Sequence, residues 1–350
     1  MKWKFYSLAF VAGMSILTAC SSDDNNDNDG NGGNGNGNEI ENGTILKGTI
    51  TSDVTLAAGN TYKLSGEYIV EEGATLHIEE GVKIIAVYDD IADYILVKQG
   101  GKINAVGTPD KPIVMTSEKE EPGAWGGIHI CGRAHTNAEG GKGSSEIGGA
   151  VYGGNDDADN SGTLQYIRLE YTGFAFDEEH EANGISFYGV GNGTIVDHCQ
   201  AYKGSDDGFE FFGGSVNVSN LVAVSCSDDS FDWTEGWNGK GTNLVAYQED
   251  KSTLGYDCDC LMECDNNGSN NAATPVAHPV LKNLILVGNG GSKQGIRLRA
   301  GTEVEIDNAK VCGKGQPLTV ETALTENALK NGTSKLTNIT LTSELSKIGR

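Results

Sequence analysis

The residues best suited to chemistry are two acidic pairs that recur along the chain. Ser205-Asp206-Asp207-Gly208 returns 22 residues later (206 to 228) as Ser227-Asp228-Asp229-Ser230. Glu210 and Asp232 follow the two pairs at equal distances. If the two stretches stack on each other, their carboxylates meet on one surface. The sequence therefore predicts six acids on two adjacent repeats, namely Asp206, Asp207, Glu210, Asp228, Asp229 and Asp232.

Carboxylates on strands stacked about 4.8 Å apart repel one another unless something neutralises them. Ca²⁺ is one candidate, because it takes about six to eight oxygen ligands, and its predicted ligands are Asp206, Asp207, Asp228 and Asp229. Acid–base cleavage of a glycosidic bond is another, with the same four aspartates and Arg297 as catalytic residues. In a third interpretation the aspartates cap turns and face water. The sequence leaves all three open.

Short strand-like segments should carry further binding residues on the same surface. Gly208-Phe209-Glu210-Phe211 resembles Ser230-Phe231-Asp232-Trp233 and Gly295-Ile296-Arg297-Leu298. Side chains alternate between the two faces of a strand, so the middle residue of each segment should point outward. The outward rows would then be His129, Ser186, Glu210, Asp232 and Arg297, beside Cys131, Tyr188, Phe212, Thr234 and Arg299. Exposed rings beside charged groups suit a carbohydrate platform, so the expected ligand-binding residues are Glu210, Asp232, Tyr188, Phe212, Trp237, Arg297 and Arg299.

A second repeating pattern, of apolar residues, indicates the strands that must position these residues. Leu164-x-x-Ile167-x-Leu169 recurs as Val196-x-x-Cys199-x-Ala201 and as Val218-x-x-Leu221-x-Ala223. The closest copies are again 22 residues apart (196 to 218). Propeller blades would need about 40 residues for four strands. The pattern instead predicts an all-β fold, a single-stranded right-handed parallel β-helix of ~22-residue coils with loop insertions.

The beginning of the repeat region also resembles a known family. Gly73-Ala74-Thr75-Leu76-His77-Ile78 and Gly123-Ala124-Trp125-Gly126-Gly127-Ile128 resemble the opening coils of pectin-lyase-like β-helix proteins on bacterial surfaces. The resemblance covers roughly Thr44 to the C-terminus. It implies the fold and not one activity, since this fold carries lyases, hydrolases, adhesins and binding proteins. The Gly-His-Gly element of polygalacturonase-like hydrolases is missing, so their activity does not transfer.

The first 43 residues predict export and anchoring. Residues 1–19 have the layout of a signal peptide, with Lys2 and Lys4 before an apolar run. Leu17-Thr18-Ala19-Cys20 resembles the lipobox of bacterial lipoproteins, which implies lipidation of Cys20 and anchoring in a membrane. Residues 20–43 are rich in Asn, Gly and Asp and predict a flexible tether. Ser followed by acids after Cys20 resembles Bacteroidota-type surface lipoproteins, which implies an outer-membrane location facing the exterior. The folded domain would span 44–350.

Composition limits the partners. The chain of 350 residues has a formal net charge of −24, with 50 glycines and 6 prolines. Such an acidic body argues against nucleic acid and anionic membrane surfaces as ligands. It would also repel an anionic polysaccharide unless a cation such as Ca²⁺ bridged the two.

Seven cysteines remain after Cys20. Three of them, Cys258, Cys260 and Cys264, lie in an apparent insertion between Gln248 and Pro279. A disulfide that closes this loop is expected, with its pairing open; unpaired thiols and a metal site are the alternatives.

These features favour a surface lipoprotein that binds an extracellular ligand, a glycan, with the help of Ca²⁺. The alternatives are a polysaccharide lyase or glycoside hydrolase of pectin-lyase-like type, and an adhesin or structural envelope protein.

Overall fold

The computed structural model describes residues 38–345 except 90 and 177–179. The predicted signal peptide and Cys20 lie outside the described residues. The described residues all belong to one compact unit. Its first strand, β1 (Asn38–Ile40), already pairs with β3 (Val54–Leu56), so the solenoid begins before the boundary predicted at Thr44. No helix in the described part of the chain is long and apolar enough to cross a membrane.

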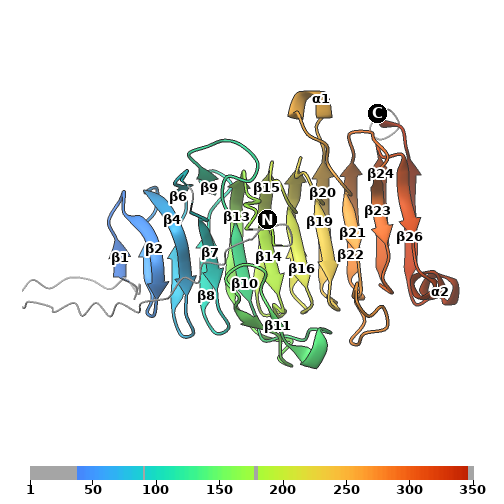
Figure 1. Ribbon diagram of the computed structural model, residues 1–350, viewed down its shortest axis with the longest axis horizontal. Helices are drawn as coiled ribbons and strands as arrows, with labels where there is room; N and C mark the ends of the chain where they lie inside the picture. The colour runs from blue at the N-terminus through green and yellow to red at the C-terminus, as the bar shows by residue number, and fades with distance from the viewer. Residues whose placement is uncertain (1–37, 90, 177–179, 346–350) are drawn as a thin grey trace, which may run out of the picture. The chain divides into compact units, whose positions relative to one another are not determined.

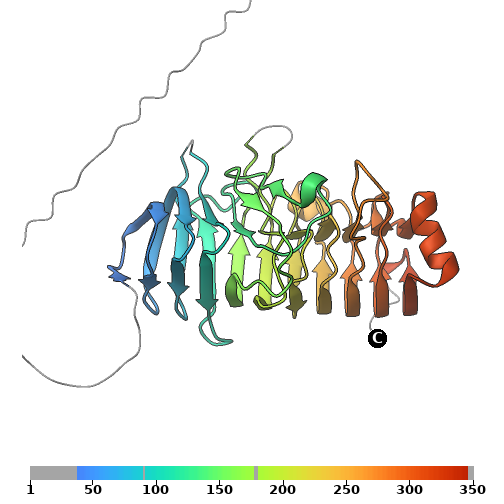
Figure 2. The ribbon, with the colours of Figure 1, turned by 90° about the horizontal axis from the view of Figure 1, so that it is seen from below.

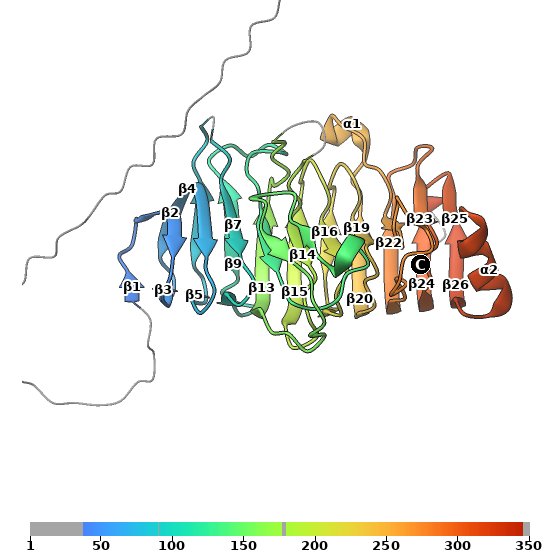
Figure 3. The same ribbon diagram turned by 60° about the horizontal axis from the view of Figure 1, so that its bottom comes forward.

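Apart from one short antiparallel pair, Gly143–Ser144 with Val151–Tyr152, the strands of this unit stack in parallel, coil upon coil, as a right-handed β-helix (Figures 1 and 2). This confirms the predicted fold. The first coils contain β1, β3, β2 (Ile45–Ile50), β4 (Thr61–Val70), β5 (Thr75–Ile78) and β6 (Lys83–Ala86). One face of the later coils, the short-strand sheet, contains β7 (Tyr94–Val97), β10 (Ile128–Cys131), β14 (Ile185–Tyr188), β16 (Phe209–Phe212), β19 (Phe231–Thr234), β21 (Met262–Cys264), β23 (Gln294–Leu298) and β25 (Gln316–Val320). Figure 3 shows β14, β16, β19 and β23 following one another along the axis.

The remaining faces of the later coils are formed by strands that bend at a corner. They are β8 (Lys102–Val106), β9 (Ile113–Ser117), β13 (Gly162–Glu170), β15 (Ile195–Tyr202), β17 (Asn217–Ser219), β18 (Val222–Val224), β20 (Lys240–Tyr247), β22 (Val280–Val287), β24 (Glu305–Cys312) and β26 (Lys335–Thr342). The predicted apolar ladder is found here, because Leu164 lies opposite Val196 and Val196 opposite Val218. Gly241 lies opposite Val218 and interrupts this apolar ladder. A side chain would not fit there, because its Cβ would lie 2.7 Å from Leu281 Cδ2.

From Asn220 onward asparagines form the corner between these faces, a position held by Tyr166 and His198 in the two coils before. Asn220, Asn243, Asn283 and Asn308 all have φ between 55° and 62°, a left-handed conformation that Asn tolerates better than most residues. The Nδ2 group of Asn243 donates to Asn220 Oδ1 at 2.9 Å, and that of Asn283 donates to Asn243 Oδ1 at 3.0 Å. The repeated Asn in the sequence therefore turns the chain and links successive coils.

Two additions cover parts of the stack. The loop 132–161, which contains the 3₁₀ turn Glu139–Gly141, β11 (Gly143–Ser144) and β12 (Val151–Tyr152), packs Ile147 and Tyr152 over the short-strand sheet. At the other end, α2 (Ala323–Asn331) lies against the last coil (Figure 1).

The segment between Gln248 and Pro279 is only partly an insertion, which corrects the expectation from sequence. It begins with α1 (Lys251–Leu254), but β21 within it pairs with β19 on one side and β23 on the other. The segment therefore supplies a coil of its own.

Candidate functional site

The outward row of the short-strand sheet is set by strand register. Ser186 lies opposite Glu210, Glu210 opposite Asp232, Asp232 opposite Glu263, and Glu263 opposite Arg297. The predicted order of Glu210, Asp232 and Arg297 is therefore found, with Glu263 inserted before the arginine. We call Asp206, Asp207, Glu210, Asp228, Asp229, Asp232 and Glu263 the acidic row.

The turns that precede these strands are linked by aspartate side chains. Asp207 Oδ1 accepts the backbone N–H of Asp229 at 2.8 Å. Asp229 Oδ1 in turn accepts the backbone N–H of Cys260 at 2.6 Å. The turn-capping part of the third interpretation is thus true of one oxygen of Asp207 and one of Asp229. The part that has them face water is wrong for these two residues, because both side chains are buried. The second oxygen of each carboxylate is left for other partners.

The oxygens of the acidic row converge in overlapping groups of three. Within each group the candidate ligand atoms lie within 4.8 Å of one another. The groups are Asp206-Asp207-Asp228, Asp207-Glu210-Asp232 and Asp229-Asp232-Glu263. Because Asp207 and Asp232 each belong to two groups, the structure brings all six predicted acids into one continuous cluster.

Burial and mutual repulsion make this cluster costly to ionise. Burial, followed by repulsion from neighbouring acids, raises the pKa of Asp207, Glu210, Asp229 and Asp232 well above the usual range. Burial and the nearby Asp228 raise the pKa of Asp206 to about 8. Without a counter-ion, the cluster therefore holds protons at neutral pH.

Arginines close the C-terminal end of the row. Arg297 donates to Glu263 Oε1 at 2.8 Å and to both oxygens of Glu321 at 3.1 and 3.2 Å. Arg299 contacts Glu263 Oε2 at 2.6 Å and Asp265 Oδ1 at 2.7 Å. Both guanidinium groups expected to bind ligand are therefore engaged by carboxylates of the protein.

One atom in the row is suited to a positively charged partner. Asp232 Oδ1 is buried and has no hydrogen-bond partner among the described residues. An unpaired buried carboxylate oxygen is costly, and a hard cation would satisfy it. The donor set around it, which consists of carboxylate oxygens from Asp229, Glu263, Asp207 and Glu210, fits Ca²⁺ chemistry.

The predicted aromatic platform is wrong, because its three rings are buried. Tyr188 is 0% exposed, Phe212 7% and Trp237 1%. Tyr188 and Phe212 do point away from the coil interior, but they stack with centroids 4.4 Å apart beneath the loop 132–161. Trp237 turns back into the core, stacks on Phe211 at 4.2 Å and donates from Nε1 to Val216 O.

The expected disulfide is not formed either. Cys258, Cys260 and Cys264 are all buried free thiols. Cys264 lies on β21 opposite Trp233 and belongs to the main core. Cys264 thus serves as a packing residue of a coil, and none of the three closes a loop by a disulfide. Cys260 also converges with Asp229 and Asp259 in a group whose ligand atoms lie within 4.8 Å of one another.

The repeat pattern missed two acids of the site, Glu146 and Glu263. Glu146 comes from the covering loop, and its Oε2 accepts the Tyr188 hydroxyl at 3.2 Å. Burial raises the pKa of Glu146 to about 7. Nothing in the local sequence marks it, because its place depends on how the loop packs. Glu263, by contrast, had a signal in the apolar-acid-apolar triplet Met262-Glu263-Cys264.

A comparison with protein families agrees with the architecture. A family described as "Pectate-lyase like beta helix domain" matches residues 48–349. Among solved structures, the catalytic domain of a GH87 α-1,3-glucanase variant in complex with tetrasaccharides shares 12% sequence identity with a TM-score of 0.20. That alignment covers 83% of this chain and 62% of the glucanase chain. No curated protein sequence matches significantly.

Proposed function

Because the chain belongs to the family of pectate-lyase like beta helix domains, we propose that it binds an extracellular glycan with a divalent cation such as Ca²⁺ held in the acidic row. We further propose that it acts at the outer-membrane surface, facing the exterior, through a lipid on Cys20. The observation that supports a bound cation is that Asp232 Oδ1 is buried and has no hydrogen-bond partner among the described residues.

The cation would be held by the oxygens that converge on this atom. Asp229, Asp232 and Glu263 form one candidate set, and Asp207, Glu210 and Asp232 form the other. A bound cation supplies positive charge and open coordination positions that glycan hydroxyls or carboxylates can occupy. It would also allow the buried acids to ionise together at neutral pH.

Binding fits the site better than catalysis does. Both arginines at the end of the row are engaged by acids, so neither guanidinium is free to stabilise negative charge that develops on a substrate. The seven described cysteines are buried, which leaves no accessible thiol nucleophile among the described residues.

Hydrolysis is the second candidate, and Asp206 supports it. This partly exposed carboxyl keeps its proton at neutral pH, because burial and Asp228 raise its pKa to about 8. A protonated acid beside a second carboxylate is the arrangement that glycoside hydrolases use. Asp206 would then donate the proton and Asp228 would act as its partner.

The two functions are separated by one experiment on the mature chain carrying Cys20→Ser. The protein is incubated with a panel of polysaccharides in Ca²⁺ and in chelator, and both retention and new reducing ends are measured. We expect retention that chelator abolishes, without products. New reducing ends or unsaturated products would replace the binding proposal by the enzymatic one.

The anchor is tested separately in cells. We expect labelled palmitate to enter the full-length protein and not its Cys20→Ser variant. Protease added to intact cells should degrade the anchored protein. Resistance to protease on intact cells, with digestion after lysis, would place the protein on the inner face of the membrane.

A further inference from the structure

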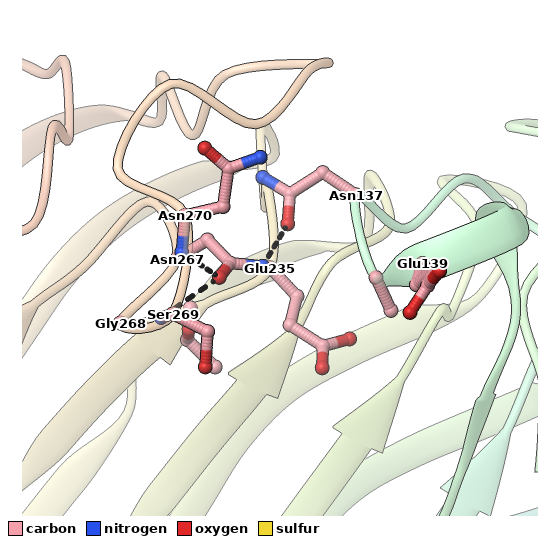
Figure 4. A pocket seen from close by; sticks show the side chains of 9 residues that line it. Asn137, Glu139, Glu235, Asn267, Gly268, Ser269 and Asn270 are labelled. Carbon is pink, nitrogen blue, oxygen red and sulfur yellow. Dashed lines mark hydrogen bonds between the residues drawn. The ribbon is translucent and has the colours of Figure 1, made fainter.

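A polar pocket of about 730 Å³ opens beside the acidic row (Figure 4). Its floor is formed by Thr234 and Glu235 at the end of β19, and its walls by two loops, 137–139 and 267–270. Thr234 follows Asp232 by two residues on β19, so both side chains lie on the same face of the strand. The volume is within the range of small-molecule sites, about 300–1,000 Å³.

The two walls are fixed by hydrogen bonds before any ligand arrives. Asn137 Nδ2 donates to Asn266 Oδ1 at 2.8 Å and to Pro275 O at 3.0 Å. Asn267 Nδ2 donates to Asn137 Oδ1 at 3.0 Å, a contact visible in Figure 4. Asn266 is 0% exposed, and its Nδ2 also donates a hydrogen bond to Ala273 O. Such preorganisation lowers the entropy lost on binding.

Several groups that line the pocket have no partner in the described part of the chain. Glu235 uses Oε2 to accept the hydroxyls of Thr136 at 2.6 Å and Tyr152 at 2.8 Å. Its Oε1 makes no further hydrogen bond within the described residues, and the same is true of Ser269 Oγ. The pocket therefore offers fixed acceptors and donors to a ligand.

The lining also excludes several ligand classes. Glu139 and Glu235 are acidic and no Lys, Arg or His lines the pocket, which disfavours uronates, sulfates and phosphates. Ala138 is the only apolar lining residue apart from Gly268, which disfavours lipids and aromatic ligands. Neither glutamate belongs to a converging group of metal-ligand atoms among the described residues. A molecule that is rich in hydroxyls and carries no negative charge remains.

We propose that this pocket binds a neutral saccharide unit of the glycan, which makes the protein selective for neutral polysaccharides over uronate-containing ones. The inference rests on the proposed glycan binding and adds its site and its ligand class. A chain held in the pocket by one sugar can continue along the same face over Asp232.

The test compares two tryptophan substitutions in the same loop. Ser269→Trp fills the pocket, whereas Ala272→Trp adds an equal ring at an exposed position that does not line it. Binding of the mature Cys20→Ser chain and both variants is measured by affinity electrophoresis in Ca²⁺. The probes are neutral glucans, xylans and mannans, and the acidic polygalacturonate and alginate.

We expect retention on a neutral polysaccharide that Ser269→Trp weakens at least about tenfold and that Ala272→Trp leaves unchanged. Equal binding by Ser269→Trp and the parent chain would overturn the pocket while leaving glycan binding intact. Retention on acidic probes alone would overturn the neutral selectivity. A parent chain retained by no polysaccharide would overturn both the pocket and the proposed function.

Discussion

Asp207 and Asp229 are joined along the solenoid axis by a hydrogen bond in which the backbone N–H of Asp229 donates to Asp207 Oδ1 at 2.8 Å. Asp229 repeats the arrangement toward Cys260 at 2.6 Å. Each carboxylate therefore has a structural oxygen and an oxygen that remains for the acidic row. These two roles can be separated by substitution.

Asp229→Asn keeps an oxygen acceptor for Cys260 but removes the charge. We expect it to lower Ca²⁺ affinity at least about tenfold without lowering the melting temperature measured in chelator. Asp229→Ala removes the acceptor as well and leaves the buried N–H of Cys260 unpaired. That variant should lose about 1–3 kcal/mol of unfolding free energy. Calorimetry and denaturant titration measure the two effects.

Asp110→Asn is the matched control, because Asp110 is an exposed acid outside the row. It should change neither quantity. Unaltered Ca²⁺ affinity in Asp229→Asn would exclude this residue as a cation ligand.

The raised pKa values predict an unusual dependence of stability on pH. Asp206, at about 8, and Glu146, at about 7, keep protons in the folded state that they lose in the unfolded state above about pH 4. The folded state thus binds more protons across this window, and the free energy of unfolding falls as pH rises from about 4 to about 8. Ca²⁺ should reverse the loss near the upper end, because it stabilises the ionised acids.

Thermal melts between about pH 5 and about pH 8, in chelator and in Ca²⁺, test this dependence. Asp206→Asn should flatten part of the slope in chelator. A melting temperature that rises with pH in chelator would contradict the protonated cluster.

How far the sequence predicts this site depends on coil length. Glu210 and Asp232 were predicted in register because equal 22-residue spacing (210 to 232) makes neighbouring coils superimpose. The next coil holds α1 and its loop, so the spacing becomes 31 residues (232 to 263) and Glu263 escaped the pattern. A repeat length in the sequence identifies the fold from coils of equal length, but it does not detect a coil that carries an extra loop.

Alternation along a strand distinguishes the interior of the coil from its outside, but it says nothing about loops. It correctly placed Tyr188 and Phe212 outside the coil. It could not show that Tyr152, more than 30 residues earlier (152 to 188), would cover Tyr188 with ring centroids 5.2 Å apart. Long-range packing of this kind has no local signal.

Because the described thiols are buried and free, we expect reductants not to change the stability of the protein. All seven described cysteines are free and buried. We expect a thiol reagent to label none of them in the native Cys20→Ser chain and all seven after denaturation without reductant. The melting temperature should be the same with and without reductant. Fewer than seven labelled thiols in the denatured chain would show that a disulfide exists.

Substitutions of Trp237 distinguish a role in core packing from a role in ligand binding. It is 1% exposed and stacked on Phe211, so Trp237→Ala should lower the free energy of unfolding by about 3–5 kcal/mol. Trp237→Phe keeps a ring in the stack and should lose less, while its glycan affinity equals that of the parent chain. Denaturant titration and affinity electrophoresis measure the two properties on the same samples. If Trp237→Phe kept full stability but lost glycan affinity, the ring would be a ligand contact and its assignment to the core would be wrong.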